Sequence, residues 1–343
     1  MVDINKLVRN NIRSLTPYSC ARDEFEGKKG IFMDANENPF GNLNRYPDPY
    51  QKELKAAISR IKGIEEEKIF LGNGSDEIID LCFRTFCNPG TDKFLTFSPT
   101  YGIYEVSAVI NDVKVINIPL NEDFQIDIND VIPWLTDEKL KLIFICSPNN
   151  PTGNSMNVAD IEYIIENFKG IVVLDEAYID FSDKPSFIRM VDRYFNLIVM
   201  QTFSKALGLA AARIGMAFTN PSIINYFNKL KSPYNISTIN QKAALKRIDK
   251  IDKYKSQVRI IKKERGRLSE NLGKLPIINQ VFSSDANFLL VKVNNAGFIY
   301  KSLVDRNIIV RNRSNAVENC LRITVGTRYE NERLINALKR IVV

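Results

Sequence analysis

Short apolar runs alternate with amphipathic segments through the middle of the chain. The runs are rich in Val, Ile, Leu and Phe, as is typical of buried strands, whereas residues 101–110 and 159–168 repeat apolar side chains at helical spacing. The strands predicted in this way cover residues 93–97, 113–118, 141–146, 171–175, 197–201 and 214–218. Strands that alternate with helices indicate βαβ units, in which helices cover both faces of a mainly parallel sheet.

The pattern changes near Pro221. A long helical stretch runs from there to about Leu272, and a shorter mixture of strands and helices follows it. In that mixture we predict strands at 286–293, 308–311 and 321–325 and helices at 298–305 and 330–340. The N-terminal residues show no βαβ pattern of their own, so we expect them to pack with the C-terminal part. The predicted organisation is a large α/β domain over 30–235 and a small α+β domain formed by 1–29 together with 236–343.

Composition narrows the possible chemistry. The 343 residues carry a formal charge of +7, are 45% hydrophobic and 25% charged, and include no histidine. The missing histidine excludes Ser-His-Asp and Cys-His catalysis, histidine proton shuttles and histidine-ligated metals. The basic stretch at 242–267 shows neither interleaved aromatics nor a recognised nucleic-acid-binding module, so we expect no nucleic-acid partner. A general base must therefore be Lys, Asp, Glu, Tyr or Cys.

Cysteine usage and the apolar runs indicate the compartment. The five cysteines show no CxxC spacing, which favours reduced, buried thiols and predicts no metal site. Residues 1–17 lack the apolar core of a signal peptide, and no apolar run is long enough to cross a bilayer. We therefore expect a cytoplasmic protein without a membrane partner.

Three predicted strands end in polar, loop-forming residues. The strand at 141–146 leads into residues 147–153, the next ends at Asp175, and the strand at 197–201 leads into a segment that includes Lys205. In open α/β sheets, ligands bind beyond the carboxyl ends of the strands, so these residues are expected to share one site.

The residue types at these strand ends are those that a pyridoxal phosphate site needs. A lysine amine bonds the cofactor, and a carboxylate pairs with its pyridinium nitrogen. Asn and Tyr side chains donate to its phenolic oxygen. Hydroxyls, a helix N-terminus and an arginine hold its phosphate, and an arginine follows eight residues after Lys205.

Ten motifs stand in order along the chain, and together they carry a family resemblance. They are RSLTPY (13–18), DANENP (34–39), NRYPDP (44–49), GNGSDE (72–77), SPTYGIY (98–104), SPNNPTG (147–153), DEAYIDF (175–181), TFSKALGLA (202–210), IIVR (308–311) and LRITVGT (321–327). With these motifs the chain resembles, over nearly its whole length, the fold-type I aminotransferases and within them the histidinol-phosphate aminotransferases. The resemblance implies an α/β fold with a mostly parallel seven-stranded sheet between helices and a smaller α+β domain.

The resemblance also implies pyridoxal 5'-phosphate and the residues that hold it. Lys205 matches the lysine that forms the Schiff base, and Asp175 matches the carboxylate at the pyridinium nitrogen. Tyr178 and Asn150 match the donors to the phenolic oxygen, and Tyr101 matches the aromatic ring that stacks on the cofactor. The implied phosphate contacts are Thr202, Ser204, Arg213 and the backbone N–H groups of Ser75 and Asp76.

The resemblance further implies a homodimer and a set of substrate contacts. Tyr46 matches a tyrosine that reaches the cofactor phosphate of the neighbouring subunit, which implies shared active sites. Arg322 matches the arginine that binds the substrate α-carboxylate. Arg311, Tyr18 and Asn36 match positions for the additional contacts that a phosphate-bearing substrate needs. The neighbouring Arg313 has no assigned role.

The implied reaction is a ping-pong transamination through Lys205. L-histidinol phosphate and 2-oxoglutarate would give 3-(imidazol-4-yl)-2-oxopropyl phosphate and L-glutamate. Two alternatives use the same scaffold: an aromatic or broad-specificity amino-acid aminotransferase, and a phosphothreonine decarboxylase. A third is a cofactor-binding regulatory module without turnover, which would typically carry a fused DNA-binding domain that 343 residues do not accommodate.

Overall fold

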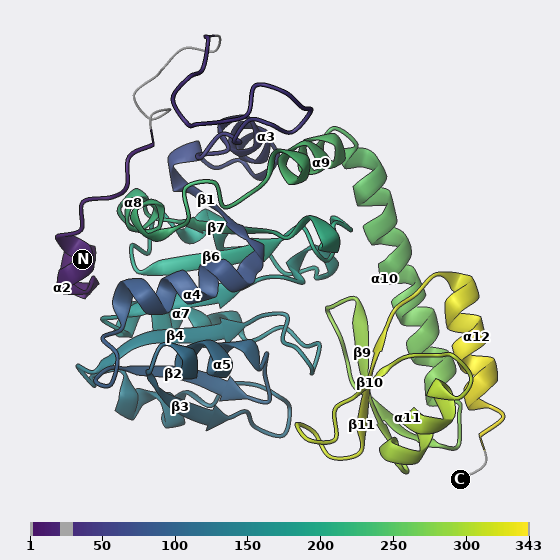
Figure 1. The fold of residues 1–343 in the computed structure, drawn as a ribbon. Helices are drawn as coiled ribbons and strands as arrows, with labels where there is room; N and C mark the ends of the chain where they lie inside the picture. The colour runs from purple at the N-terminus through teal and green to yellow at the C-terminus, as the bar shows by residue number, and fades with distance from the viewer. Residues whose placement is uncertain (1–2, 21–29, 342–343) are drawn as a thin grey trace.

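The computed structural model describes residues 3–20 and 30–341, which form a large α/β part and a smaller C-terminal part (Figure 1). The large part is built on a seven-stranded sheet in the order β1-β7-β6-β5-β4-β2-β3. Its strands are β1 Ile69–Asn73, β2 Lys93–Ser98, β3 Lys114–Pro119, β4 Leu140–Cys146, β5 Ile171–Asp175, β6 Leu197–Thr202 and β7 Ile214–Thr219. Only β7 runs antiparallel to its neighbours, β6 and β1. The α/β fold class predicted from the sequence is therefore confirmed.

Side-chain alternation along the central strands explains why both faces of this sheet are covered. Val172 and Leu174 of β5 belong to one apolar cluster, whereas Ile171 and Val173 belong to the other. Because successive side chains point to opposite faces, an all-apolar strand needs a helical layer on each side. One layer includes α4 Gly74–Phe86, α5 Ile103–Ile110 and α8 Pro221–Leu230, and the other includes α3 Lys52–Lys62, α7 Val158–Asn167 and α9 Thr238–Ile248.

The smaller part contains a four-stranded antiparallel sheet in the order β10-β11-β9-β8. Its strands are β8 Ile278–Val281, β9 Phe288–Val293, β10 Arg311–Asn312 and β11 Cys320–Thr324, and its helices are α11 Ala296–Val304 and α12 Arg328–Leu338. The long helix α10, Ile251–Gly273, joins the two parts: Val258 lies in a cluster of the large sheet, and Leu268 lies in the cluster of the small one. The helical stretch predicted from Pro221 to Leu272 is thus three helices, α8, α9 and α10.

The N-terminal helices pack on the large sheet. Helices α1, Ile4–Leu7, and α2, Asn10–Arg13, place Ile4 and Ile12 in the same apolar cluster as α4 and α8. The Tyr226 hydroxyl donates to Asn5 Oδ1 at 2.8 Å and fixes this contact. The described part of 1–29 therefore does not pack with the small domain as expected, because its apolar stripe meets α4 and α8. The division near residue 235 stays a prediction.

The remaining helices are short. They are α6 Ile128–Val131 and the 3₁₀ turns η2 Glu66–Lys68, η3 Ile132–Trp134, η4 Ile179–Phe181, η5 Phe187–Met190 and η6 Ala210–Ala212. Within residues 3–20 and 30–341, no helix combines the length and apolarity that a membrane crossing requires.

Candidate active site

A cavity of about 230 Å³ lies at the carboxyl ends of β4, β5 and β6, beside the start of α4 and next to β11. It is lined by most of the residues that the sequence predicts, namely Ser75, Asp76, Tyr101, Asn150, Asp175, Tyr178, Thr202, Ser204, Lys205, Arg213 and Arg322. Its lining also includes Cys146, Ala177, Ala210 and Arg313, to which the sequence analysis assigned no role. The predicted residues Tyr18, Asn36, Tyr46 and Arg311 do not line it.

Asp175 supplies a buried carboxylate at the end of β5. Its Oδ1 accepts a hydrogen bond from the Ala177 N–H at 3.0 Å, and its Oδ2 accepts one from the Tyr104 hydroxyl at 2.6 Å. Burial raises the pKa of Asp175, while these two hydrogen bonds and the charge of Lys205 oppose the rise. The cost of burying the charged carboxylate of Asp175 is thus partly offset, and this carboxylate can pair with a cationic group in the cavity.

Tyr104 is a hydrogen-bond partner of Asp175 that the sequence analysis missed. Its side chain is fully buried on α5, where a phenol needs a hydrogen-bond partner, and it finds one in Asp175. The only sequence signal was its place at the end of the motif at 98–104, three residues after Tyr101. The two rings meet edge to face, with their centroids 5.5 Å apart.

Lys205 follows β6, and its amine lies 5.6 Å from the centre of the Tyr178 ring. Partial loss of water lowers the pKa of Lys205, the positive charge of Arg322 lowers it further, and Asp175 opposes both. A lysine with a lowered pKa carries a larger share of the neutral amine, which is the nucleophilic form. Burial raises the pKa of Tyr178, so its hydroxyl keeps its proton and can donate a hydrogen bond.

Two glycines allow Arg213 to reach the N-terminus of α4. A side-chain carbon at Gly74 would stand 2.5 Å from Arg213 Nη2, and one at Gly215 would stand 2.5 Å from the Ser75 nitrogen. Gly74 also adopts φ +77°, and its N–H donates to the Arg213 carbonyl at 2.8 Å. The Arg213 guanidinium pairs with Asp76 at 2.9 Å. Free N–H groups at a helix start, combined with an arginine, form an anion site.

The turn after β6 completes this anion site. The Thr202 hydroxyl accepts a hydrogen bond from the Ser204 N–H at 3.1 Å and donates to the Ile214 carbonyl at 3.2 Å. These bonds fix the turn that precedes Lys205. The cavity thus offers an anion site, an amine and a buried carboxylate. This donor set fits the phosphate, aldehyde and ring nitrogen of pyridoxal phosphate.

Arg322 brings the small sheet to the cavity. On β11 it donates to the Asn150 side-chain oxygen, so the NH₂ group of Asn150 remains available as a donor. Its guanidinium lies 5.2 Å from the centre of the Phe288 ring. Arg311 on β10 is the register partner of Arg322, but it lies outside the cavity lining.

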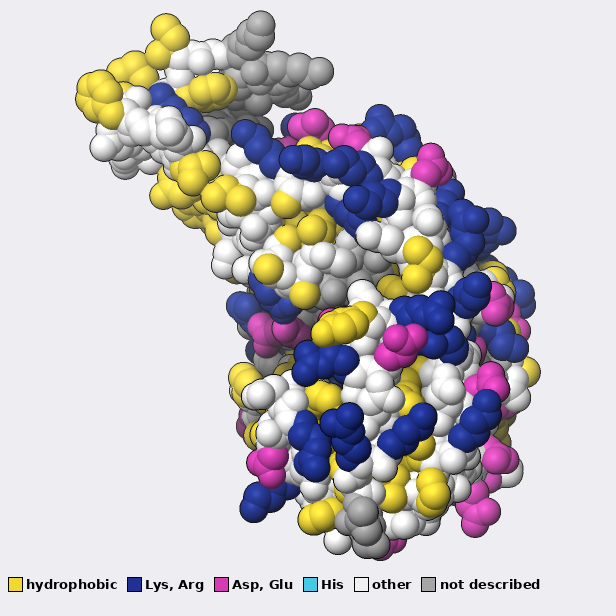
Figure 2. Space-filling model, turned by 90° about the vertical axis from the view of Figure 1, so that its right-hand side faces the viewer, with side chains coloured by type: hydrophobic (Ala, Val, Ile, Leu, Met, Phe, Trp, Pro, Cys, Tyr) yellow, Lys and Arg dark blue, Asp and Glu magenta, His cyan; other side chains and the backbone are white. Residues whose placement is uncertain are grey.

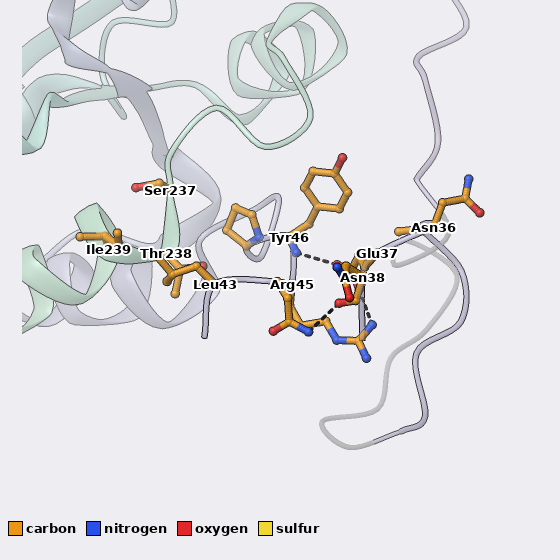
Figure 3. A pocket seen from close by; sticks show the side chains of 12 residues that line it. Asn36, Glu37, Asn38, Leu43, Arg45, Tyr46, Ser237, Thr238 and Ile239 are labelled. Carbon is orange, nitrogen blue, oxygen red and sulfur yellow. Dashed lines mark hydrogen bonds and ion pairs between the residues drawn. The ribbon is translucent and has the colours of Figure 1, made fainter. Parts of the chain in front are cut away.

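Tyr46 and Asn36 line a second cavity, of about 440 Å³, formed by segments 35–38, 43–47 and 237–239. There the Glu37 carboxylate accepts hydrogen bonds from the Tyr46 N–H and from Arg45, each at 2.6 Å (Figure 3). The Tyr46 ring stacks on Tyr234 with a centroid separation of 4.3 Å. A single chain therefore does not bring Tyr46 or Asn36 to Lys205.

Comparison with known proteins identifies the family. A family model for class I and II aminotransferases matches residues 17–338. The chain is 50% identical over 345 residues to the histidinol-phosphate aminotransferase of Bacteroides fragilis, and the match spans 99% of each chain. It belongs to the histidinol-phosphate aminotransferases. It is therefore a pyridoxal-phosphate-dependent aminotransferase of histidine biosynthesis, which confirms the prediction from the motifs.

Solved structures support the fold of this aminotransferase. The histidinol-phosphate aminotransferase of Clostridium acetobutylicum aligns with a TM-score of 0.80 at 29% identity, and the alignment covers 87% of this chain and 90% of that one. The enzyme of Sinorhizobium meliloti, in complex with pyridoxal 5'-phosphate, aligns with a TM-score of 0.77 at 24% identity, covering 89% of each chain.

Proposed function

We propose that this aminotransferase converts L-histidinol phosphate and 2-oxoglutarate into 3-(imidazol-4-yl)-2-oxopropyl phosphate and L-glutamate at the cavity around Lys205. The observation that carries the proposal is that this one cavity gathers Lys205, Asp175, Arg213 and Arg322. The Lys205 amine can bond the aldehyde of the cofactor, and the Asp175 carboxylate can pair with its ring nitrogen. The two arginines can bind two separate anions.

Different residues of the chain would hold different parts of the cofactor. Lys205 would bond its aldehyde carbon, Asp175 would hold the pyridinium nitrogen protonated, and Tyr101 would stack on the ring. Tyr178 and Asn150 would donate to its phenolic oxygen. The phosphate contacts would be Ser75, Asp76, Thr202, Ser204 and Arg213. When bound, the cofactor ring accepts the electron pair released at the amine-bearing carbon of the substrate.

Lys205 would also move the proton of the reaction. The amine of Lys205 would take the proton from the amine-bearing carbon of the substrate and would deliver it to the aldehyde carbon of the cofactor. The lowered pKa of Lys205 supports this role because a larger share of the amine is then unprotonated near neutral pH.

Arg322 would bind the anionic end of each substrate in turn. Its planar guanidinium can pair with the α-carboxylate of glutamate through two parallel hydrogen bonds, and the same donors can meet phosphate oxygens. The bond from Arg322 to Asn150 links substrate binding to a cofactor contact. Arg311 would contribute positive charge from the adjacent strand.

We propose that the working unit is a cytoplasmic homodimer. Ile31, Met33 and Phe40 are 92%, 90% and 82% exposed, and apolar side chains gather on the lobe that projects from the top of the molecule (Figure 2). A second copy would cover this apolar surface, and Tyr46 would then reach the cofactor phosphate of the partner site. Tyr18, itself 76% exposed, and Asn36 would serve as substrate contacts only in that assembly.

The test is a half-reaction without keto acid. Purified holoenzyme would be mixed separately with histidinol phosphate, phenylalanine and phosphothreonine, and the loss of the cofactor's lysine-bound absorbance band followed over time. We expect histidinol phosphate to convert the band to that of the amine form much faster than phenylalanine does. Faster conversion by phenylalanine would instead indicate an aromatic aminotransferase, and release of carbon dioxide from phosphothreonine would indicate a decarboxylase.

A further inference from the structure

The hairpin formed by β10 and β11 carries three arginines. Arg311 and Arg322 are direct register partners, and the Arg313 N–H donates to the Cys320 carbonyl at 2.9 Å, which continues the same ladder. Because side chains alternate along a strand, Arg311 and Arg313 lie on the same face as Arg322. Arg313 and Arg322 line the cavity, and Arg311 does not.

Arg313 is anchored by its backbone but not by its side chain. Its carbonyl accepts hydrogen bonds from the Ala316 and Val317 N–H groups at 2.8 and 2.9 Å. Its Nε is buried and has no hydrogen-bond partner. In the described ranges 3–20 and 30–341, no ion pair or hydrogen bond involves its guanidinium. A buried donor without a partner is costly, which suggests that a ligand supplies the acceptor.

The charge around Arg313 favours an anion of more than one unit. Partial burial and the neighbouring positive charges of Arg322 and Arg311 lower the pKa of Arg313, and Tyr178 and Tyr101 oppose this. A carboxylate carries one charge and two oxygens, which one bidentate arginine satisfies. A phosphate monoester carries a charge of about −1.5 to −2 at neutral pH and three strong acceptor oxygens. The phosphate therefore needs a donor that the carboxylate does not.

We propose that Arg313 is a specificity-determining residue that hydrogen-bonds the phosphate of histidinol phosphate and contributes little to binding the α-carboxylate of glutamate. The inference rests on the proposed function, since it assigns one more contact to the same cavity. Arg322 serves both substrates, and Arg313 serves only the phosphate-bearing one.

The experiment compares Arg313→Gln and Arg313→Lys with wild-type holoenzyme. Glycerol 3-phosphate, a phosphomonoester without an amine, and glutarate, a dicarboxylate without an amine, are titrated by calorimetry, and KM and kcat are measured for histidinol phosphate and glutamate. Arg306→Gln is the matched control, because Arg306 is exposed on the same part of the fold and its Nη1 donates to the Ser302 carbonyl at 2.7 Å.

Arg313→Gln should weaken glycerol 3-phosphate binding and raise the KM for histidinol phosphate by about tenfold or more, as expected for the loss of a hydrogen bond to a charged group. Glutarate binding, the KM for glutamate and both kcat values should stay within about twofold. Arg313→Lys should lose less than Arg313→Gln, because it keeps the charge, and Arg306→Gln should match the wild type.

If Arg313→Gln weakened the binding of glycerol 3-phosphate and of glutarate equally, the assignment would be overturned, because Arg313 would then attract any anion through its charge alone. Unchanged glycerol 3-phosphate binding in both Arg313 variants would overturn it as well. If Arg313→Gln does not fold, Arg313→Lys still separates the two ligands. A wild-type enzyme that fails to convert histidinol phosphate would refute the proposed function instead, whereas the glycerol 3-phosphate titrations would still decide the role of Arg313.

Discussion

Asp175 and Lys205 take their chemical character from side chains that other elements bring to them. The carboxylate of Asp175 is bonded by Tyr104 of α5, and the charge of Arg322 on β11 acts on Lys205. The motifs that follow the strands predicted Asp175 and Lys205, because local chain geometry places them at strand ends. Tyr104 could not be assigned from sequence, because its partner lies 71 residues away and only the folded sheet brings them together.

Replacing Arg322 should move the pH at which Lys205 reacts. The charge of Arg322 disfavours the protonated lysine, so Arg322→Gln should raise the pKa of Lys205 and shift the reactive, neutral form to higher pH. The rate at which apoenzyme takes up pyridoxal phosphate, followed by absorbance across pH, should show its rising limb at higher pH in the variant. A limb that stays in place or moves to lower pH would contradict this electrostatic explanation.

Removing the Tyr104 hydroxyl should destabilise the apoenzyme. Tyr104→Phe leaves one oxygen of the buried Asp175 carboxylate without its donor, at an expected cost of about 1–3 kcal/mol in the free energy of unfolding. Denaturant titration measures this cost. Tyr194→Phe is the control, because the Tyr194 hydroxyl donates at 2.8 Å to a half-exposed carboxylate, Glu166, and should cost less. Equal losses in the free energy of unfolding of the two variants would show that the hydrogen bond from Tyr104 does not stabilise the buried Asp175 carboxylate.

At the scale of elements, the site depends on how closely β7 approaches the start of α4. The sequence predicted β7, but it did not predict β1, Ile69–Asn73, because only three apolar residues precede the glycine-rich motif at 72–77 that leads into α4. Nor could it show that Gly215 touches the backbone of α4, since that contact exists only after β7 has inserted between β1 and β6.

A methyl group at Gly215 should displace the helix start. In Gly215→Ala the added carbon would stand 2.5 Å from the Ser75 nitrogen, so α4 must shift. Its N–H groups would then leave the position that we propose for binding the cofactor phosphate. We expect a loss of about 1–3 kcal/mol in stability and a cofactor Kd raised by about tenfold or more.

Gly266→Ala is the control for this change, because in residues 3–20 and 30–341 no atom other than those of its chain neighbours and its own helix backbone lies within 4 Å of the added carbon on α10. It should stabilise the protein by about 0.5–1 kcal/mol and leave cofactor binding unchanged. The two variants would be compared by denaturant unfolding and cofactor titration. Wild-type cofactor affinity in Gly215→Ala would show that the position of the helix start does not govern phosphate binding.

At the scale of the whole molecule, the separation of Tyr46 from the Lys205 cavity carries the argument for shared sites. The family resemblance predicted Tyr46 for the neighbouring subunit and Tyr18 and Asn36 for the substrate. Hydrophobic pattern alone cannot distinguish an exposed dimer surface from a core, because both are apolar in sequence.

Co-expression of two inactive variants tests that arrangement. Lys205→Ala and Tyr46→Ala should each impair the homodimer, whereas a mixed dimer contains one site with an intact Lys205 and a Tyr46 supplied by the other subunit. With random pairing, about one quarter of all sites should be active, so the rate of glutamate formation should reach about one quarter of the wild-type rate. No recovery in purified mixed dimers would mean that Tyr46 serves its own subunit, and an active Tyr46→Ala homodimer would mean that it serves neither site.

Reductive trapping tests whether Lys205 is the attachment point of the cofactor. Holoenzyme would be treated with borohydride, which converts the bond between cofactor and lysine into a stable amine, then digested and examined by peptide mass spectrometry. We expect the cofactor mass on the peptide that contains Lys205, and we expect no such mass after the same treatment of Lys205→Arg. Cofactor attached to a different lysine in the wild-type protein would contradict the assignment of the active site.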